Sequence, residues 1–475
     1  MALFVVAAST PSRLFSYLTP NKKKSSEDAL TCISIVIRKD GTPTTKCIYS
    51  AQPDRTPRRR RASSSSSLLL PTPPNKRRLI FQFPNFHNNK RTVSRCNAPL
   101  SARKGIPDKL QCLPLELLQH ILYFLDLRSL LTMRTVSRQF DRLCGRENHD
   151  VWRALFSCDF FPLICNLEDP YQSYVDHHEL NRRWRAGEAR TSYLKGHTDS
   201  VYCLAWVGPH HIVSGSRDKT IKLWDLRKPG HCIKTERQHQ GSVLCLHATD
   251  RYLISGSSDT TCLIWSLPDC RPLRRLEGHT GGVLDLCVVD GWIVTSSRDS
   301  TIRVWDQESG QEQRRLVGHS GPVNALEAYG SKVISASGDT TLKLWDVATG
   351  QCLRTFVGHT RGLACVKYNG KWIYSGGQDG IRVWDAETGE CLITLGGHTD
   401  LIRTIDCYGD KIVSGSYDRT LRVWDAKTGE CLMRCQSGHS SWIFNVLMSS
   451  TRIVSASQDR RIMVLDFAYN LHSLA

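Results

Sequence analysis

The feature that most constrains the fold is a segment of about 40 residues that recurs seven times in the second part of the chain. Each copy has a His, then an Asp 20 or 21 residues later, and in six copies a Trp five or six residues after that Asp. Successive His residues stand 42, 40, 40, 40, 39 and 41 positions apart. A fixed period makes each copy one structural unit, so every residue is interpreted by its place in the unit. The seven sets are His197/Asp218/Trp224, His239/Asp259/Trp265, His279/Asp299/Trp305, His319/Asp339/Trp345, His359/Asp379/Trp384, His398/Asp418/Trp424 and His439/Asp459/Leu465.

Short alternating runs inside each unit predict β-strands. Examples are HIVSGS at 211–216 and IKLWD at 221–225, which are separated by turn residues. A period near 40 residues with Gly-His and Trp-Asp marks is typical of four-stranded propeller blades. Residues 191–467 therefore resemble a WD-repeat β-propeller, an all-β ring of seven blades. We expect the segment 190–197 to supply the fourth strand of the seventh blade, because this closes the ring and removes exposed edges.

The repeated polar residues are predicted to be structural. A hydroxyl stands four residues before each Asp, and we expect the His of the same unit to bridge the two, with the Trp ring N–H as a further donor. Seven identical His/hydroxyl/Asp sets are not expected to be catalytic, because site chemistry normally occurs once on a scaffold. The hydroxyls belong to Ser214, Ser255, Thr295, Ser335, Ser375, Ser414 and Ser455.

The first 105 residues differ in composition from the rest. They hold 20 Lys and Arg against 4 Asp and Glu, and so carry +16 of the net charge of +18. Stretches such as RTPRRRRASSSSS and LPTPPNKRRL predict a disordered basic tail over 1–105 that is rich in Ser and Pro. Three interpretations stay open: a nuclear address or nucleic-acid contact through the basic clusters at 58–61 and 76–78, an organelle transit peptide, and a solvated tail or an extension from a wrongly assigned start.

Cysteine usage and hydropathy indicate the compartment. The 19 cysteines are odd in number and include no Cys-x-x-Cys pair, which argues against a disulfide framework, a zinc module and a RING-type transfer domain. No metal or cofactor is expected. No apolar run is long enough to span a membrane, so we expect a protein of the nucleus or cytoplasm, with organelle targeting as an alternative. Cys352, Cys391 and Cys431 share one repeat position, where a small buried side chain is expected.

The stretch 113–144, LPLELLQHILYFLDLRSLLTMRTVSRQFDRLC, predicts helices. Pro114 suits the first turn of a helix, and apolar residues follow it at helical spacing. Asp126 is expected to cap a second helix that continues to about residue 143, and a third, short helix carries Trp152. A unit of about 45 residues buries its own surface only marginally. Packing on itself or on the propeller, and binding of a partner helix by its leucine-rich side, both stay open.

Residues 107–157 resemble an F-box. With a WD-repeat propeller, the chain resembles the F-box/WD-repeat family, the substrate receptors of SCF-type (Skp–cullin–F-box) ubiquitin ligases. The resemblance implies that the helices dock on a Skp-type adaptor, and through it on a cullin, while the propeller holds a protein substrate. Residues 158–190 then form a helical spacer, and catalysis is by proximity, without a nucleophile from this chain. The implied adaptor-binding residues are Leu113, Pro114, Leu117, Ile121, Leu122, Leu125, Leu130, Val136 and Trp152.

The family also implies where a substrate binds: on the face that carries the loops before the first strand and after the second strand of each blade. Two positions per repeat point there, five residues after the His and one before the Asp, and both vary between repeats. Arginines at these positions can bind a carboxylate or phosphate, which implies an acidic or phosphorylated substrate, and aromatic residues can form a floor. Solvated surface arginines are the alternative. The candidate substrate-binding residues are Arg217, Arg298, Arg403, Tyr202, Tyr417, Trp442 and Phe444.

A second class of function stays open at this point. The chain can also be a WD-repeat scaffold outside any ligase, or an RNA-associated assembly protein that contacts nucleic acid through its basic tail. Co-purification of a Skp-type adaptor separates the two classes.

Overall fold

The structure is a computed structural model of the whole chain. It describes residues 113–160, 168–228, 230–436 and 438–474, together with the backbone of three N-terminal strands. These strands are β1 (Phe4–Ser9), β2 (Leu30–Ile37) and β3 (Pro43–Ile48). The predicted disorder of residues 1–105 otherwise falls outside the described residues and stays a prediction. The chain divides into two compact units, residues 51–145 and the residues on either side of them, and each is described by itself.

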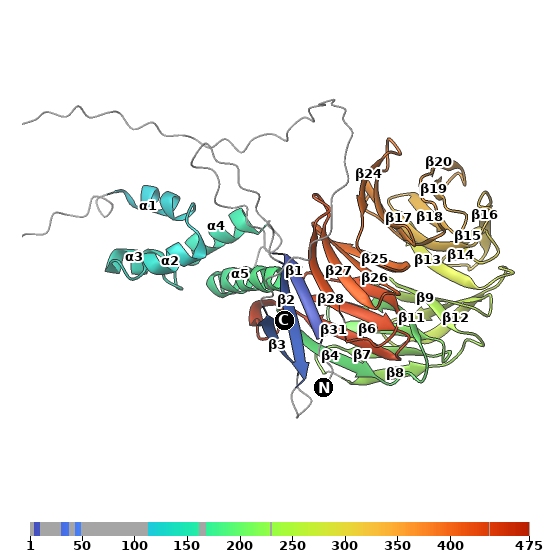
Figure 1. Cartoon of the computed structure of the whole chain (residues 1–475), viewed down its shortest axis with the longest axis horizontal. Helices are drawn as coiled ribbons and strands as arrows, with labels where there is room; N and C mark the ends of the chain where they lie inside the picture. Colours follow the sequence, from blue (N-terminus) through green and yellow to red (C-terminus); the bar gives the residue numbers. More distant parts are fainter. Residues whose placement is uncertain are drawn as a thin grey trace, which may run out of the picture. The chain divides into compact units, whose positions relative to one another are not determined.

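Seven antiparallel sheets, each with four strands from the repeat region, form the blades of a propeller (Figure 1). The first strands are β5 (Val201–Trp206), β9 (Val243–Ala248), β13 (Val283–Val289), β17 (Val323–Tyr329), β21 (Leu363–Tyr368), β25 (Ile402–Tyr408) and β29 (Ile443–Met448). The second strands are β6 (His211–Ser216), β10 (Tyr252–Ser257), β14 (Trp292–Ser297), β18 (Lys332–Ser337), β22 (Trp372–Gly377), β26 (Lys411–Ser416) and β30 (Arg452–Ser457). The third strands are β7 (Ile221–Asp225), β11 (Cys262–Ser266), β15 (Ile302–Asp306), β19 (Leu342–Asp346), β23 (Gly380–Asp385), β27 (Thr420–Asp425) and β31 (Arg461–Asp466). The fourth strands are β8 (Cys232–Glu236), β12 (Arg271–Leu276), β16 (Glu312–Leu316), β20 (Cys352–Phe356), β24 (Cys391–Leu395), β28 (Cys431–Gln436) and, in blade seven, β4 (Arg190–Lys195).

The ring closes as the sequence predicts. β4 precedes the first blade in the chain but pairs antiparallel with β31, the last strand, from Arg190 opposite Asp466 to Lys195 opposite Arg461. Blade seven is therefore built from both ends of the propeller segment. This arrangement gives the seventh sheet its fourth strand and joins the first and last repeats by main-chain hydrogen bonds.

The apolar core lies between neighbouring blades. Val294 and Ile302 of blade three, for example, pack in one buried cluster with Val323 and Trp345 of blade four. Alternation along each strand turns one face toward the preceding blade and the other toward the following blade, so both faces of the inner strands are covered. Stability is therefore shared between adjacent repeats.

The fourth strands form the outer edges of the blades, and this corrects one expectation about cysteine. Cys352 in β20 and Cys391 in β24 are exposed, and Cys431 in β28 is half-buried. We expected buried side chains at this repeat position. β20 and β24 each pair with one strand only, at the periphery of the ring, and their side chains are mostly exposed, whereas β28 lies between β27 and β1 in its sheet.

The smaller unit contains three short helices, α1 (Leu115–Leu122), α2 (Leu127–Met133) and α3 (Arg138–Leu143). Asp126 caps α2 as predicted, because its carboxylate accepts a hydrogen bond from the Ser129 N–H at 3.1 Å. The single second helix that we expected up to residue 143 is wrong. Ser137 takes an extended conformation and caps α3 through the Phe140 N–H, so the helix is interrupted before it. The hydroxyl competes for a backbone N–H, as Ser does at helix starts.

Two further helices precede the propeller, α4 (His149–Asp159) and α5 (Pro170–Ala186). Pro170 occupies the first turn of α5, and Gly187 ends it with a left-handed φ of 65°. α5 lies within the predicted helical spacer 158–190. None of the helices in the described part of the chain is both long and apolar enough to cross a membrane.

α5 is fixed to the propeller and to the segment that follows it. The Trp184 ring stacks on the Phe467 ring with centroids 3.8 Å apart, and its N–H donates to the Ser450 carbonyl at 3.0 Å. Asp176 accepts from the backbone N–H of Ser473, at the short helix η1 (His472–Leu474). These contacts come from the middle and from the C-terminal end of α5, so the helix and the propeller form one body.

Candidate functional site

The repeated polar network has the predicted geometry in all seven blades. Each His Nδ1 lies 2.7–3.0 Å from a carboxylate oxygen of its Asp. Each His Nε2 lies 2.7–2.8 Å from the Ser or Thr hydroxyl. In blades one to six the Trp ring N–H donates to the same hydroxyl at 2.8–2.9 Å. Blade seven has Leu465 in place of this Trp and keeps the other bonds.

Trp224 of blade one shows that the repeated Trp both donates a hydrogen bond and packs in the core. Its ring N–H does donate to the Ser214 hydroxyl at 2.8 Å, as predicted. The whole side chain is fully buried, however, in an apolar cluster that joins blades seven and one and includes Leu194 and Val454. Packing of a large ring is therefore its main contribution, and no ligand or partner can reach it. Trp224 belongs to the interior of the scaffold and to no binding site.

The partners determine which ring nitrogen of each His donates to the Asp. An ionised carboxylate can only accept, so Nδ1 carries a proton and donates it to the Asp. Burial lowers the pKa of His319 despite the opposing effect of Asp339. Burial opposes the charge of Asp339, but hydrogen bonds from Thr341 and His319 outweigh it and lower its pKa to about 2. These sets are closed hydrogen-bond networks with no free nucleophile.

The structure brings the four predicted aromatic residues together on one face. The rings of Tyr417 and Trp442 stack with centroids 4.7 Å apart and an interplanar angle of 11°. The Phe444 ring meets the Tyr417 ring edge-on, with centroids 5.8 Å apart. Its centroid lies 4.9 Å from that of the tilted Tyr202 ring. Tyr202, Tyr417, Trp442 and Phe444 thus form a continuous row across blades six, seven and one, which we call the aromatic platform; Phe444 is buried, Tyr202 and Tyr417 are half-buried, and Trp442 is the exposed member.

The three predicted arginines have different surroundings. Arg403 is half-buried beside the channel, and its Nη1 donates to the Ala364 carbonyl at 3.0 Å. Arg217 is exposed, with its Nε 3.7 Å from an Asp199 carboxylate oxygen. Arg298 is exposed. Arg403 is therefore the arginine that the fold holds in place, and it lies on the blade that also contributes Tyr417.

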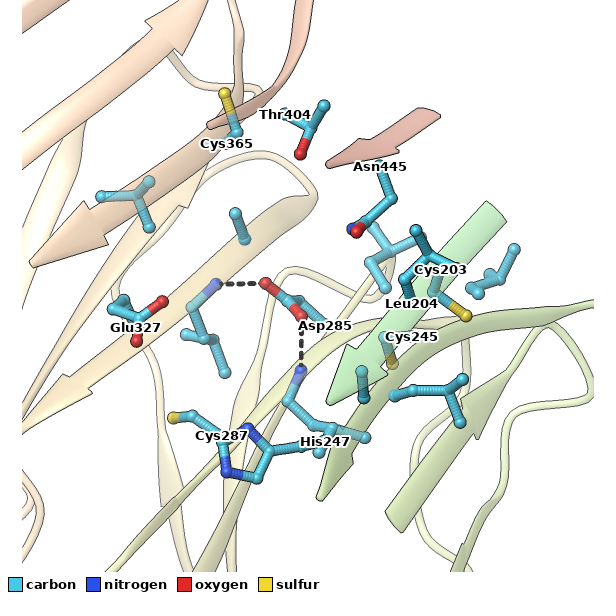
Figure 2. Close-up of a pocket in the computed structure, with 18 of the residues that line it drawn as sticks. Cys203, Leu204, Cys245, His247, Asp285, Cys287, Glu327, Cys365, Thr404 and Asn445 are labelled. Carbon is cyan, nitrogen blue, oxygen red and sulfur yellow. Dashed lines mark hydrogen bonds between the residues drawn. The ribbon is translucent and has the colours of Figure 1, made fainter. Parts of the chain in front are cut away.

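The first strands line a central channel of about 300 Å³. Two inward-facing positions per repeat, six and eight residues after the His, supply most of its polar groups. Figure 2 shows Asp285 near the middle, where its carboxylate accepts from the N–H groups of Leu286 at 2.9 Å and Leu326 at 2.8 Å. Burial raises the pKa of Asp285 to about 6. Burial also lowers the pKa of His247 to about 4, so this ring is neutral at pH 7.

A cluster of charged side chains in the channel joins three blades. It was not predicted from the sequence. The Lys367 ammonium lies 2.7 Å from a Glu327 carboxylate oxygen and 3.6 Å from one of Asp406. Burial opposes the charge of Lys367, but the two carboxylates outweigh it and raise its pKa. Glu327, Lys367 and Asp406 all stand eight residues after the His of blades four, five and six. A comparison of this repeat position between blades would have found the cluster.

The predicted adaptor-binding residues fall into two groups. Pro114, Leu117, Ile121 and Val136 are exposed, whereas Leu122 and Leu130 are fully buried. Leu113 and Leu125 are half-buried.

Trp152 belongs to the interior as well. It is fully buried, and its ring contacts Tyr171 and Tyr174 of α5 at centroid distances of 4.9 and 5.4 Å. Its place is therefore between α4 and α5, where it supports the helices. Sequence reasoning missed Phe124, which is 78% exposed between α1 and α2.

The described residues contain no group of His, Cys, Asp and Glu side chains arranged to hold a metal ion. What the geometry offers is a row of aromatic rings, a fixed arginine at the mouth of a channel, and exposed apolar side chains on short helices. These features define a protein-binding molecule built on a seven-bladed propeller.

Comparison with known proteins agrees with this class. Residues 110–158 match the F-box-like family. The WD40 family (WD domain, G-beta repeat) matches residues 188–225, 230–266, 270–306, 310–346, 350–385 and 389–425. The matches therefore end before blade seven, the blade in which Leu replaces Trp. The chain is an F-box/WD-repeat protein, with an F-box-like segment followed by a propeller.

Relatives share the same combination. The chain is 28% identical over 191 residues to F-box/WD repeat-containing protein mec-15 of Caenorhabditis elegans, over 36% of this chain and 47% of that protein. It is 32% identical over 155 residues to F-box/WD repeat-containing protein 7 of Drosophila melanogaster, over 29% of this chain and 11% of that protein. The matched segments thus span about half or less of these relatives' lengths. The solved WD40 β-propeller domain of Doa1 is 26% identical with a TM-score of 0.54, over 59% of this chain and 97% of that structure.

Proposed function

We propose that this chain is the substrate-recognition subunit of an SCF-type ubiquitin ligase. The helices α1, α2 and α3 bind a Skp-type adaptor that links them to a cullin, and the propeller binds the protein to be ubiquitinated. The chain itself performs no chemistry, and it acts by holding its substrate close to a ubiquitin-charged enzyme. The observation that carries the proposal is an F-box-like segment with exposed apolar side chains ahead of a WD-repeat propeller in one chain.

The exposed side chains of α1 support a partner at this segment. Leu117, Ile121 and Phe124 follow one another at spacings of four and three residues, which places them on one side of the helical segment. Leu117 is 51% exposed, although Leu118 next to it is buried. A row of large apolar side chains in water is unfavourable, and such rows usually mark interaction sites. A helix of the adaptor that covers them removes this cost.

The fixed α5 supports the role of the spacer. A ligase subunit that acts by proximity benefits from a constant distance between adaptor and substrate. The contacts of Trp184 with Phe467 and Ser450, and of Asp176 with Ser473, hold α5 against the propeller. α4 packs on α5 through the buried Trp152, so these two helices and the propeller belong to the same unit.

The proposed substrate segment is acidic or phosphorylated. Arg403 offers N–H groups beyond the one bound to Ala364, and a guanidinium binds carboxylate or phosphate oxygens with two parallel hydrogen bonds. Arg298 stands on the opposite side of the ring, on blade three, so an extended peptide across the channel mouth can reach both. Arg217 contributes less, because Asp199 already offsets its charge.

The decisive experiment is capture of a Skp-type adaptor by the full-length protein. Leu117→Asp introduces a charge on the exposed side of α1, and we expect it to reduce capture by about 30-fold or more, since a buried unpaired charge costs several kcal/mol. The matched control is Leu353→Asp, on the outer strand of blade four, where the leucine is 47% exposed. Equal capture by the wild type and Leu117→Asp, or no capture by either, contradicts the proposal.

A further inference from the structure

The aromatic platform occupies only one side of the face that we propose for substrates. Its four rings come from blades six, seven and one. The equivalent positions of blades two to five carry no aromatic side chain. Those residues are Leu244, Leu284, Asn324 and Ala364 after the His, and Ser258, Arg298, Gly338 and Gln378 before the Asp. The face is therefore divided into an aromatic side and a side of small, aliphatic and polar groups, which indicates that a ligand binds it in one direction.

Trp442 stands apart from the repeat pattern. It lies three residues after the blade-seven His, and the other six blades have Ser200, Ser242, Gly282, Pro322, Gly362 and Leu401 at this position. The propeller fold does not need a large side chain here, since six blades form without one. Trp442 is nevertheless 44% exposed, while the structural Trp residues of the repeats are buried. A large ring at a position that the scaffold leaves small points to a role in binding.

The platform is held in place before any ligand arrives. One face of the Trp442 ring is covered by Tyr417. The backbone carbonyl of Trp442 accepts a hydrogen bond from the Gln458 N–H at 3.0 Å. The neighbouring Ser441 hydroxyl donates to the Gln458 side chain at 2.5 Å. Within the described part of the chain, the Trp442 ring N–H has no acceptor. A rigid ring with an open face and a free donor loses little conformational entropy on binding.

The charge beside the platform restricts what can bind it. Arg403 is close enough to Tyr417 to oppose the effect of burial, which raises the pKa of the Tyr417 hydroxyl. Aromatic faces attract cations as well as apolar groups, but a ligand cation here meets the positive charge of Arg403. A ligand with an apolar group next to an acidic group can place the apolar group on the aromatic platform and the acidic group on Arg403.

From these observations we infer that the substrate segment carries a bulky apolar anchor residue that packs on Trp442 and Tyr417, with an acidic residue close to it in sequence that binds Arg403. This inference rests on the proposed function, which gave the substrate segment an acidic residue. It adds a bulky apolar residue to the recognised motif. The aromatic contact supplies most of the affinity, because buried aromatic anchors dominate binding at interfaces. The arginine then selects peptides with the acid on the correct side of the anchor.

The test uses a library of unphosphorylated nine-residue peptides, each with one acidic residue and one position varied through all amino acids, screened against the full-length protein. We expect enrichment of Trp, Phe, Tyr, Leu and Met at a fixed distance from the acid. In Trp442→Ala this preference should disappear, and the best peptide should bind about 30-fold more weakly. In Arg403→Gln the apolar preference should persist while the preference for the acid is lost.

Two controls separate a binding role from a structural one. Trp442→Phe keeps a flat ring and should keep the apolar preference. Tyr329→Ala removes an aromatic side chain that is 56% exposed at the far end of a first strand in blade four, and it should change nothing. Enrichment of Lys or Arg at the varied position, an unchanged preference in Trp442→Ala, or no enrichment at all would each overturn the inference.

The same variants distinguish this inference from the proposed function. Trp442→Ala should capture the Skp-type adaptor as the wild type does, because the platform is on the propeller. If the wild type captures no adaptor but selects apolar–acidic peptides, the ligase role fails and the peptide site stands. If the adaptor binds and no peptide preference depends on Trp442, the ligase role stands and the anchor site fails.

Discussion

Replacing Asp339 by Ala is expected to destabilise the propeller without changing any binding surface directly. The Asp339 carboxylate accepts four hydrogen bonds, from the His319 ring at 2.8 Å, the Ser320 N–H at 3.0 Å, and the Thr341 N–H and hydroxyl at 2.9 and 2.7 Å. Two of the four donors are backbone groups in an accessible turn, which water can satisfy. The His319 ring is buried, so its Nδ1–H is left without a good acceptor.

The size of the effect follows from that single buried donor. An unsatisfied buried polar group costs about 1–3 kcal/mol, and the Thr341 hydroxyl, 3.4 Å from Nδ1, recovers a part of this. We therefore expect a loss of about 2 kcal/mol in the free energy of unfolding, or a fall of about 4 °C in Tm for a domain of this size. Asp339→Asn keeps one acceptor oxygen and should lie between the wild type and Asp339→Ala.

The assay is thermal unfolding of the full-length protein followed by tryptophan fluorescence. The matched control is Asp346→Ala in the same blade, where the carboxylate accepts one hydrogen bond, from the Thr349 N–H at 2.9 Å, and Tm should change little. An unchanged Tm in Asp339→Ala combined with loss of peptide binding would refute the reasoning, because it would make Asp339 a ligand-binding group.

Three further outcomes are expected. Burial lowers the pKa of His319 and of its equivalents His279 and His359, so the unfolded chain takes up these protons first and is favoured below about pH 6.5, whereas Asp285, with a pKa raised to about 6, acts in the opposite direction. In Asp285→Asn, which removes the opposing group, Tm should fall as the pH is lowered from 7 to 5, and a flat profile contradicts this. Lys367→Met leaves the Glu327 carboxylate without its cation and should lower the free energy of unfolding, measured by chemical denaturation, by about 2 kcal/mol. This is less than the cost of breaking a fully buried pair, because the Lys367 side chain is 29% exposed to the channel. Deleting residues 1–105 removes β1, which pairs with β28 of blade six, but should leave adaptor capture unchanged, and the tail fused to a fluorescent protein should enter the nucleus; accumulation in plastids or mitochondria contradicts the nuclear interpretation.

The repeat made most of the propeller predictable. Each structural position occurs in seven copies, so a single departure such as Leu465 does not hide the pattern. Closure by β4 followed from counting strands. The network of His, hydroxyl, Asp and Trp followed from residue types that satisfy one another's hydrogen bonds.

Features that occur once were harder to predict. The break between α2 and α3 depends on whether Ser137 continues a helix or caps the next one, and the apolar spacing is similar in both cases. The cluster of Glu327, Lys367 and Asp406 joins residues about 40 positions apart, so it is invisible within any one repeat. The aromatic platform was predicted as a set, but the stacking of Trp442 on Tyr417 depends on how two neighbouring blades pack.

The pairing of β4 with β31 also has a consequence for synthesis. Arg190 and Asp466 are partners in one sheet, yet 276 residues separate them in the chain. During translation β4 emerges first and has no partner strand until the ribosome has completed the seventh repeat. Six blades can form while the ring is still open, and the seam is then closed by a contact of very long range, the slowest kind to form. A nascent chain of this protein therefore exposes an unpaired strand edge for most of its synthesis, and a premature stop before β31 leaves that edge open permanently, in a form suited to aggregation or to capture by chaperones.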